Sequence, residues 1–200
     1  QQALRSEWMR SSWRSRKIKM SSRYKWLMTA LIIIANLPIS ANDNALQIAE
    51  RFITSFYSWD QNALNALLTE DGDHQSIIYY QGWAEGGNYS IKTRRPCVMN
   101  KDAVSCSITV TDDFGLALGY IATDTFILKI SNGQVTEVTF TADDPPIFDK
   151  LVNWIMNERD HILTGPCLDM FAGGLTPKIC AKTVAKSAEE FMRVEVLKQQ

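Results

Sequence analysis

An aspartate interrupts an otherwise apolar pattern in this chain. Every second residue from Leu116 to Ile130 is aliphatic or aromatic except Asp124. Burying a carboxylate on the apolar face of a strand is costly unless the group is paired or serves a function. Asp124 is therefore the leading candidate for a catalytic residue. The alternative is a structural role, with the side chain turned outward by a bulge or paired with an arginine or backbone amides.

Tyr120 lies four residues before Asp124 on the same predicted face, where its hydroxyl could hydrogen-bond a substrate oxygen. Further aromatic side chains occur on a predicted helix and on the next strand. They could line a pocket for an apolar ligand, although core packing would explain them equally well. The predicted pocket residues are Tyr80, Trp83, Leu118, Phe126 and Phe140.

Alternating helical and strand patterns frame these residues. Period-two alternation predicts strands at about 89–98, 104–112, 116–130 and 134–142. Apolar residues spaced by three and four, together with capping residues, predict helices that begin near residues 44, 60, 73, 144 and 176. The expected fold class is α+β: a curled antiparallel sheet packed against N-terminal helices, followed by C-terminal helices.

The last hairpin has two possible registers. A two-residue turn at Asn132-Gly133 would place Leu128 opposite Glu137, whereas a three-residue loop with a bulged Gly133 joins the apolar faces. We therefore predict the three-residue loop, which places Asp124 opposite Phe140.

Four cysteines allow three disulfide pairings. A four-residue loop at 100–103 would place Cys97 directly opposite Cys106, within disulfide reach. Cys167–Cys180 then follows by elimination. A zinc site lacks the short Cys-x-x-Cys spacing, and we expect neither a metal nor a cofactor.

The N-terminal region has the pattern of an export signal. Basic residues precede a short apolar run and a small-residue exit, which predicts a signal peptide at 20–41 and an upstream extension at 1–19. The alternative, a membrane anchor, would need about 20 apolar residues. We expect a periplasmic or secreted protein that meets the membrane only through this signal, with a main domain at 42–160 and a disulfide-linked helical extension at 161–200.

The charge distribution argues against nucleic acid as a partner. Eight basic residues and one acid precede position 42, so the remainder has 13 basic and 21 acidic residues. Binding to phosphates needs clustered Lys and Arg, which an acidic body does not favour.

From about residue 44 to 160, the chain resembles the nuclear transport factor two-like superfamily, with its SnoaL-like and ketosteroid isomerase-like members. The resemblance rests on the order of elements and on the segments 49–53, 110–115 and 125–128. It implies a cone-shaped fold. In such folds the inner face of the sheet often carries a carboxylate, and the apolar walls of the pocket raise the pKa of that carboxylate. It also implies that the third helix closes the mouth of the pocket.

Three functions remain open at this point, because function resides in the site and not in the fold. The first is binding of a small apolar molecule without catalysis. The second is an isomerase, cyclase or hydrolase in which Asp124 acts as general base. The third is an interaction module that forms a homodimer through an apolar outer face of the sheet.

Overall fold

A computed structural model describes residues 41–170 and 174–198 of the chain. The predicted upstream extension and nearly all of the predicted signal peptide lie outside the described residues. Within that part, no helix is long and apolar enough to cross a membrane. The elements are α2 (Ala41–Tyr57), α3 (Gln61–Asn65), α4 (Gln75–Gly86), β1 (Ser90–Arg94), β2 (Val98–Asn100), β3 (Ala103–Thr111), α5 (Asp113–Leu118), β4 (Ala122–Ser131), β5 (Gln134–Ala142), α6 (Pro146–Glu158), α7 (Asp160–Leu163) and α8 (Pro177–Lys198).

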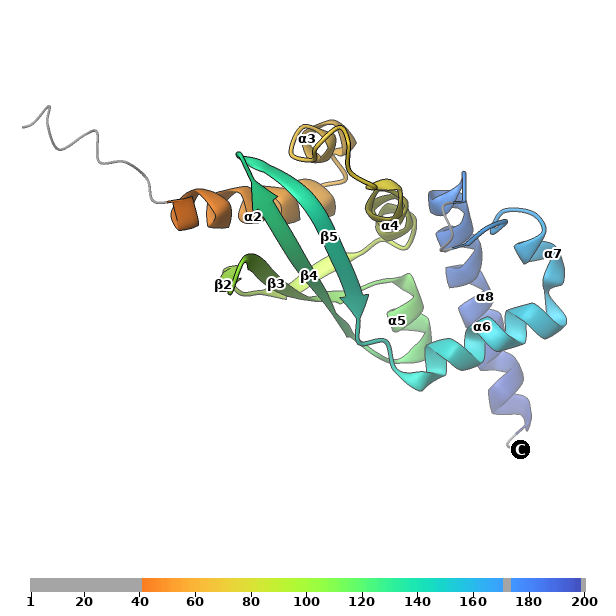
Figure 1. Ribbon diagram of the computed structural model, residues 1–200. Helices are drawn as coiled ribbons and strands as arrows, with labels where there is room; N and C mark the ends of the chain where they lie inside the picture. Colours follow the sequence, from red (N-terminus) through yellow and green to blue (C-terminus); the bar gives the residue numbers. More distant parts are fainter. Residues whose placement is uncertain (1–40, 171–173, 199–200) are drawn as a thin grey trace, which may run out of the picture. The chain divides into compact units, whose positions relative to one another are not determined.

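The strands form one open antiparallel sheet in the order β1-β3-β4-β5, with β2 paired to the other end of β3. Helix α2 runs beside this sheet, and β5 leads directly into α6 (Figure 1). The predicted α+β class is confirmed. The sheet is curled and antiparallel, and helices precede and follow it in the sequence.

A first hydrophobic cluster joins α2 to the inner face of the sheet. The apolar stripe of α2 that sequence spacing predicts is buried, and Phe52 and Phe56 are at most 1% exposed. Their rings contact Phe126 of β4 at centroid distances of 5.9 and 5.0 Å in edge-to-face geometry, which aromatic pairs prefer. Burial of these rings holds α2 against β4.

A second hydrophobic cluster joins α4 to the C-terminal helices. In Figure 1, α8 runs alongside α4, and α5 and α6 lie nearby. The two long helices approach closely at Gly86, where an added Cβ would come within 2.3 Å of the Lys178 carbonyl oxygen. Trp83 of α4 stacks on Phe114 of α5 at 5.2 Å. The C-terminal helices therefore support the helix that carries two of the predicted pocket residues.

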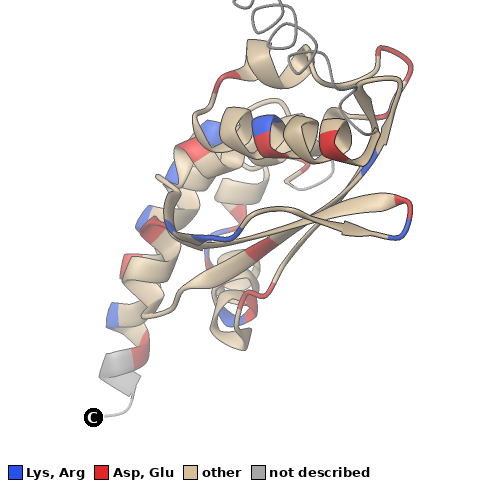
Figure 2. Ribbon diagram, turned by 90° about the vertical axis from the view of Figure 1, so that its left-hand side faces the viewer, with Lys and Arg blue, Asp and Glu red and all other residues tan. Residues whose placement is uncertain are grey.

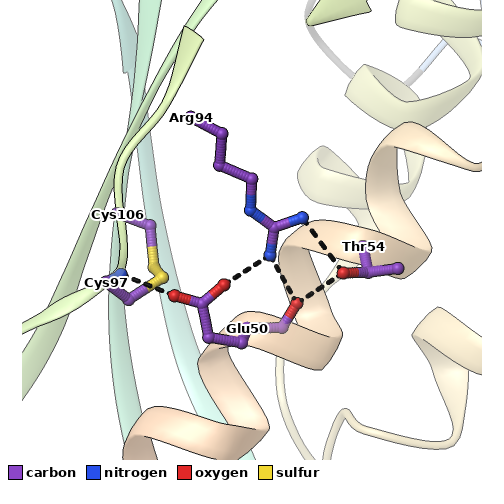
Figure 3. The surroundings of a disulfide bond; sticks show 5 residues. All are labelled: Glu50, Thr54, Arg94, Cys97 and Cys106. Carbon is purple, nitrogen blue, oxygen red and sulfur yellow. Dashed lines mark hydrogen bonds and ion pairs between the residues drawn. A yellow bond between two sulfur atoms is a disulfide. The ribbon is translucent and has the colours of Figure 1, made fainter.

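Glu50 ties α2 to the segment that joins β1 and β2 (Figure 3). Its carboxylate pairs with Arg94 at 2.5 Å and accepts the backbone N–H of Cys97 at 2.6 Å. Arg94 also donates to the Glu50 carbonyl oxygen and, at 3.1 Å, to the hydroxyl of Thr54. One glutamate thus satisfies groups from β1 and from the segment after it, beside the Cys97–Cys106 disulfide.

The predicted strand at 116–130 is wrong at its start. Residues 113–118 form the short helix α5, whose N-cap Asp112 accepts the Gly115 N–H at 2.7 Å. Gly119, with a φ of 80°, ends the helix in the left-handed conformation. Leu116 is consequently 71% exposed. The period-two alternation of apolar residues happens to continue through the helix. It concealed the N-cap Asp112 and the stop at Gly119, which indicate a helix.

The predicted register of the last hairpin is also wrong. The turn has two residues, Asn132 and Gly133, both with positive φ, and an irregularity falls within the strands, next to Lys129. This bulge shifts the pairing by one residue beyond the turn, so that Asp124 pairs with Ala142. The apolar faces of β4 and β5 still meet. A two-residue turn alone would pair apolar with polar positions, and the extra residue in the bulge restores the apolar pairing.

Hydroxyl side chains dominate the outer face of the sheet. Burial alternates along β3 and β4, and the less buried positions carry mainly Ser and Thr. Figure 2 shows few charged residues on the strands compared with α8. The outer face therefore lacks the apolar surface on which the predicted interaction module depends. Its outward-facing residues on the three long strands include Ser105, Ser107, Thr109, Thr123, Thr125, Ile127, Lys129, Glu137, Thr139 and Thr141.

Both predicted disulfides are present. Cys97–Cys106 and Cys167–Cys180 have S–S distances of 2.05 and 2.01 Å. Met99 pairs with Val104 as the hairpin prediction requires. The second bridge ties the segment after α7 to α8.

Each disulfide closes a short loop, with sequence separations of 9 and 13 residues. We expect the double variants Cys97→Ala/Cys106→Ala and Cys167→Ala/Cys180→Ala each to lower the free energy of unfolding by about 2–3 kcal/mol, because the unfolded chain gains entropy. Denaturant unfolding without reductant measures this loss. Unfolding midpoints equal to that of the unmodified chain would contradict a stabilising role.

Candidate functional site

A small cavity of about 50 Å³ lies between the sheet, α4 and the start of α6. Two of its lining residues, Ala142 and Asp144, are exposed and mark the side on which the cavity meets solvent. Six of the lining side chains are aromatic and two are carboxylates. The lining residues are Phe56, Tyr80, Trp83, Ala84, Tyr89, Asp124, Phe140, Ala142, Asp144 and Phe148.

Asp124 occupies the inner face of β4, between Ile108 of β3 and Ala142 of β5. The residue is 1% exposed. Tyr57, the last residue of α2, donates its hydroxyl to Asp124 Oδ2 at 2.5 Å. Packing of α2 on the sheet therefore delivers the hydrogen-bond donor that a buried carboxylate needs.

The environment of Asp124 favours its protonated form. Burial raises the pKa of Asp124 to about 7, and the hydrogen bond from Tyr57 opposes this rise. The neighbouring carboxylates Asp144, Asp112 and Asp143 raise the pKa further by charge repulsion. A group with a pKa near 7 can bind or release a proton near neutral pH.

Two other acids near the cavity have raised pKa values. Burial raises the pKa of Asp112, the cap of α5, to about 6, although the Gly115 N–H stabilises its charged form. Burial also raises the pKa of Asp144. Tyr120 donates its hydroxyl to Asp144 Oδ1 at 3.4 Å, and burial raises the pKa of Tyr120 so that it stays protonated.

The structure brings together only some of the residues that the sequence singles out. Tyr80, Trp83 and Phe140 line the cavity with Asp124. Phe126 lies beneath it, fully buried, with its ring 4.9 Å from Phe140. These placements make the cavity wall mainly aromatic.

Leu118 and Tyr120 do not lie on the face of β4 that carries Asp124, which corrects the predicted arrangement. Leu118 belongs to α5 and is buried in the second hydrophobic cluster. Tyr120 lies between α5 and β4 and hydrogen-bonds Asp144. The reason is the helix at 113–118, which removes both residues from the strand.

Sequence reasoning missed Tyr57. Tyr57 follows Ile53 by four residues and so continues the buried stripe of α2, a signal that could have identified it. Burial raises the pKa of Tyr89 well above its ordinary value, and Trp83 hydrogen-bonds it. Asp144 appeared to be a helix cap, but Pro145 is the N-cap of α6 and no side chain caps that end.

The described residues contain no group of three or more His, Cys, Asp or Glu side chains that could hold a metal ion. The two cavity carboxylates lie among aromatic rings, which are not ligands for hard cations such as Ca²⁺ or Mg²⁺. The arrangement can therefore accept hydrogen bonds, exchange protons or balance a positive charge.

Two solved structures are similar to this chain at low identity. A protein of unknown function with a cystatin-like fold from Xanthomonas campestris is 18% identical, with a TM-score of 0.39, over 50% of this chain and 91% of that one. AclR, a putative hydroxylase from Streptomyces galilaeus, is 13% identical, with a TM-score of 0.40, over 60% of this chain and 97% of that one. No protein-family model matches the sequence, and the comparison with curated proteins gave no match.

The raised pKa of Asp124 makes stability depend on pH. Between its ordinary value of 3.8 and about 7, the folded state holds a proton that the unfolded state has lost, so stability falls as pH rises through this window and levels off above it. We expect Asp124→Asn to gain stability relative to the unmodified chain by on the order of 4 kcal/mol between pH 4 and pH 8. Urea unfolding of both proteins measures the difference, and a pH-independent difference would contradict the assignment.

The hydrogen bond from Tyr57 stabilises the charged form of Asp124. We therefore expect Tyr57→Phe to raise the pKa of Asp124 further, as followed by carboxyl ¹³C resonances during a pH titration. Tyr120→Phe is the matched control, because its hydroxyl bonds Asp144 instead. An unchanged Asp124 titration in Tyr57→Phe would argue against this contact.

Proposed function

We propose that the chain binds a small, mostly apolar molecule in the cavity between the sheet and α4, with Asp124 as its polar anchor. The observation that carries this proposal is a buried carboxylate on a wall that is mainly aromatic. Binding sites commonly combine apolar walls with a few placed polar groups. Asp124 supplies one such group, and its position on the central strand β4 keeps it rigid.

The size of the cavity limits the ligand. About 50 Å³ is room for a few water-sized groups, far less than the roughly 300–1,000 Å³ typical of sites for drug-sized ligands. The part of the ligand that enters is therefore a group of a few heavy atoms. Any larger portion extends past Ala142 and Asp144 into solvent.

Acid–base catalysis is the second candidate function, with Asp124 as general base. The pKa of about 7 favours it, because a base works best when its pKa lies near the working pH. The hydroxyl of Tyr57, already bonded to the carboxylate, would stabilise the anion. The resemblance to the nuclear transport factor two-like superfamily, which includes isomerases, cyclases and hydrolases, is consistent with this candidate.

Export from the cytoplasm is part of the proposal. Two disulfides and the basic, apolar N-terminal pattern support a periplasmic or secreted location, because disulfides persist in oxidising compartments. A homodimer through the outer face of the sheet has less support, given its hydroxyl side chains.

Titration with 3,3-dimethyl-1-butanol, followed by amide and indole NMR resonances, tests the binding function. We expect the resonances of Trp83, Asp124 and Phe140 to shift, with a Kd on the order of millimolar. Ala142→Leu should abolish the shifts, because the larger side chain obstructs the mouth of the cavity. Ala117→Leu on α5 is the matched control and should bind normally.

Two results would overturn the proposal. One is shifts confined to residues outside the cavity, and the other is binding that Ala142→Leu leaves intact. The acid–base candidate would be favoured over binding alone if the unmodified chain shows turnover and Asp124→Asn loses that turnover but still binds the probe.

A further inference from the structure

The cavity combines two features that recognise positive charge. Six aromatic rings line it, and the face of an aromatic ring attracts cations, Trp most strongly. Two carboxylates, Asp124 and Asp144, share the lining. Among the described residues that line this cavity there is no Lys, Arg or His.

The acids around the cavity repel one another. Asp112, Asp143 and Asp144 all disfavour ionisation of Asp124. A cation inside the cavity would relieve this repulsion. An anionic ligand would add to it, and a neutral ligand would leave it unchanged.

We propose that the cavity binds the alkylated ammonium head group of a small organic cation, with the aromatic rings around the head and the carboxylates of Asp124 and Asp144 as counter-ions. This inference rests on the proposed binding function and specifies the class of ligand. A metal ion fits less well, because hard cations need several oxygen ligands and aromatic rings take up most of the wall.

Aromatic residues from several elements line the space that a methylated ammonium would occupy. Tyr80 from α4 and Phe140 from β5 lie with ring centroids 4.7 Å apart, and Trp83 follows Tyr80 by three residues, on a neighbouring position of α4. A cavity of about 50 Å³ admits a group of a few heavy atoms. Asp144 at the exposed side and Asp124 at the buried side place one carboxylate near each end of the space.

The charge of the part of the chain after the predicted signal peptide supports the same ligand. From residue 42 onward there are 13 basic and 21 acidic residues. A net negative field of this kind raises the local concentration of cations and speeds their association.

Choline and 3,3-dimethyl-1-butanol form a matched probe pair, because they differ by a quaternary nitrogen in place of a carbon. We expect choline to bind the full chain at least ten-fold more tightly at pH 8, as measured by NMR titration. Asp124→Asn and Asp144→Asn should each weaken choline binding several-fold more than they weaken binding of the neutral probe. Glu137→Gln, which removes a carboxylate of an exposed ion pair with Lys129, is the control and should change neither.

The outcomes separate this inference from the proposed function. Equal affinities, or tighter binding of the neutral probe, overturn the cationic ligand and leave the apolar cavity site standing. Cavity resonances that respond to neither probe overturn both. A choline Kd that neither Asp substitution changes also overturns the inference, because the two carboxylates would then have no role as counter-ions.

Discussion

Burial of a carboxylate on the inner face of β4 is the constraint on which the site depends. Asp124 cannot lose its hydration without a donor, and α2 supplies one through the hydroxyl of Tyr57. The same helix covers the sheet with Phe52 and Phe56, so the core that stabilises the fold also withdraws Asp124 from water. The raised pKa of Asp124 follows from that packing, and the burial that raises it lowers the stability of the fold as the pH rises above the ordinary pKa of the group.

The elements around the carboxylate are held by contacts far from it. Glu50 joins α2 to Arg94 and to the backbone of Cys97, so the first disulfide and α2 are positioned together. The second disulfide, Cys167–Cys180, connects the start of α8 to the segment after α7. Because α8 packs against α4, it supports the helix that presents the aromatic side of the cavity. Rigid support of this kind keeps a small site at a defined size.

Repulsion among the acids connects the two candidate functions. Asp124 shares its surroundings with Asp112 and Asp144, and their charges favour its protonated form. A positively charged ligand would favour the ionised form and make Asp124 a counter-ion. A neutral ligand would leave a carboxyl group that can give or take a proton. The charge of the ligand therefore decides which chemistry this carboxylate performs.

Local patterns in the sequence determined much of this protein: the α+β class, the stripe of α2, the first hairpin with its disulfide, and the misplaced acid at Asp124. These follow from short-range periodicity, loop length and capping, which depend on neighbouring residues. The tertiary structure alone decided the pairing of Asp124 with Ala142, its hydrogen bond from Tyr57, and the position of Tyr120 between α5 and β4. A bulge inside a strand and the packing of a helix on a sheet join residues distant in the chain, and no local spacing specifies such contacts.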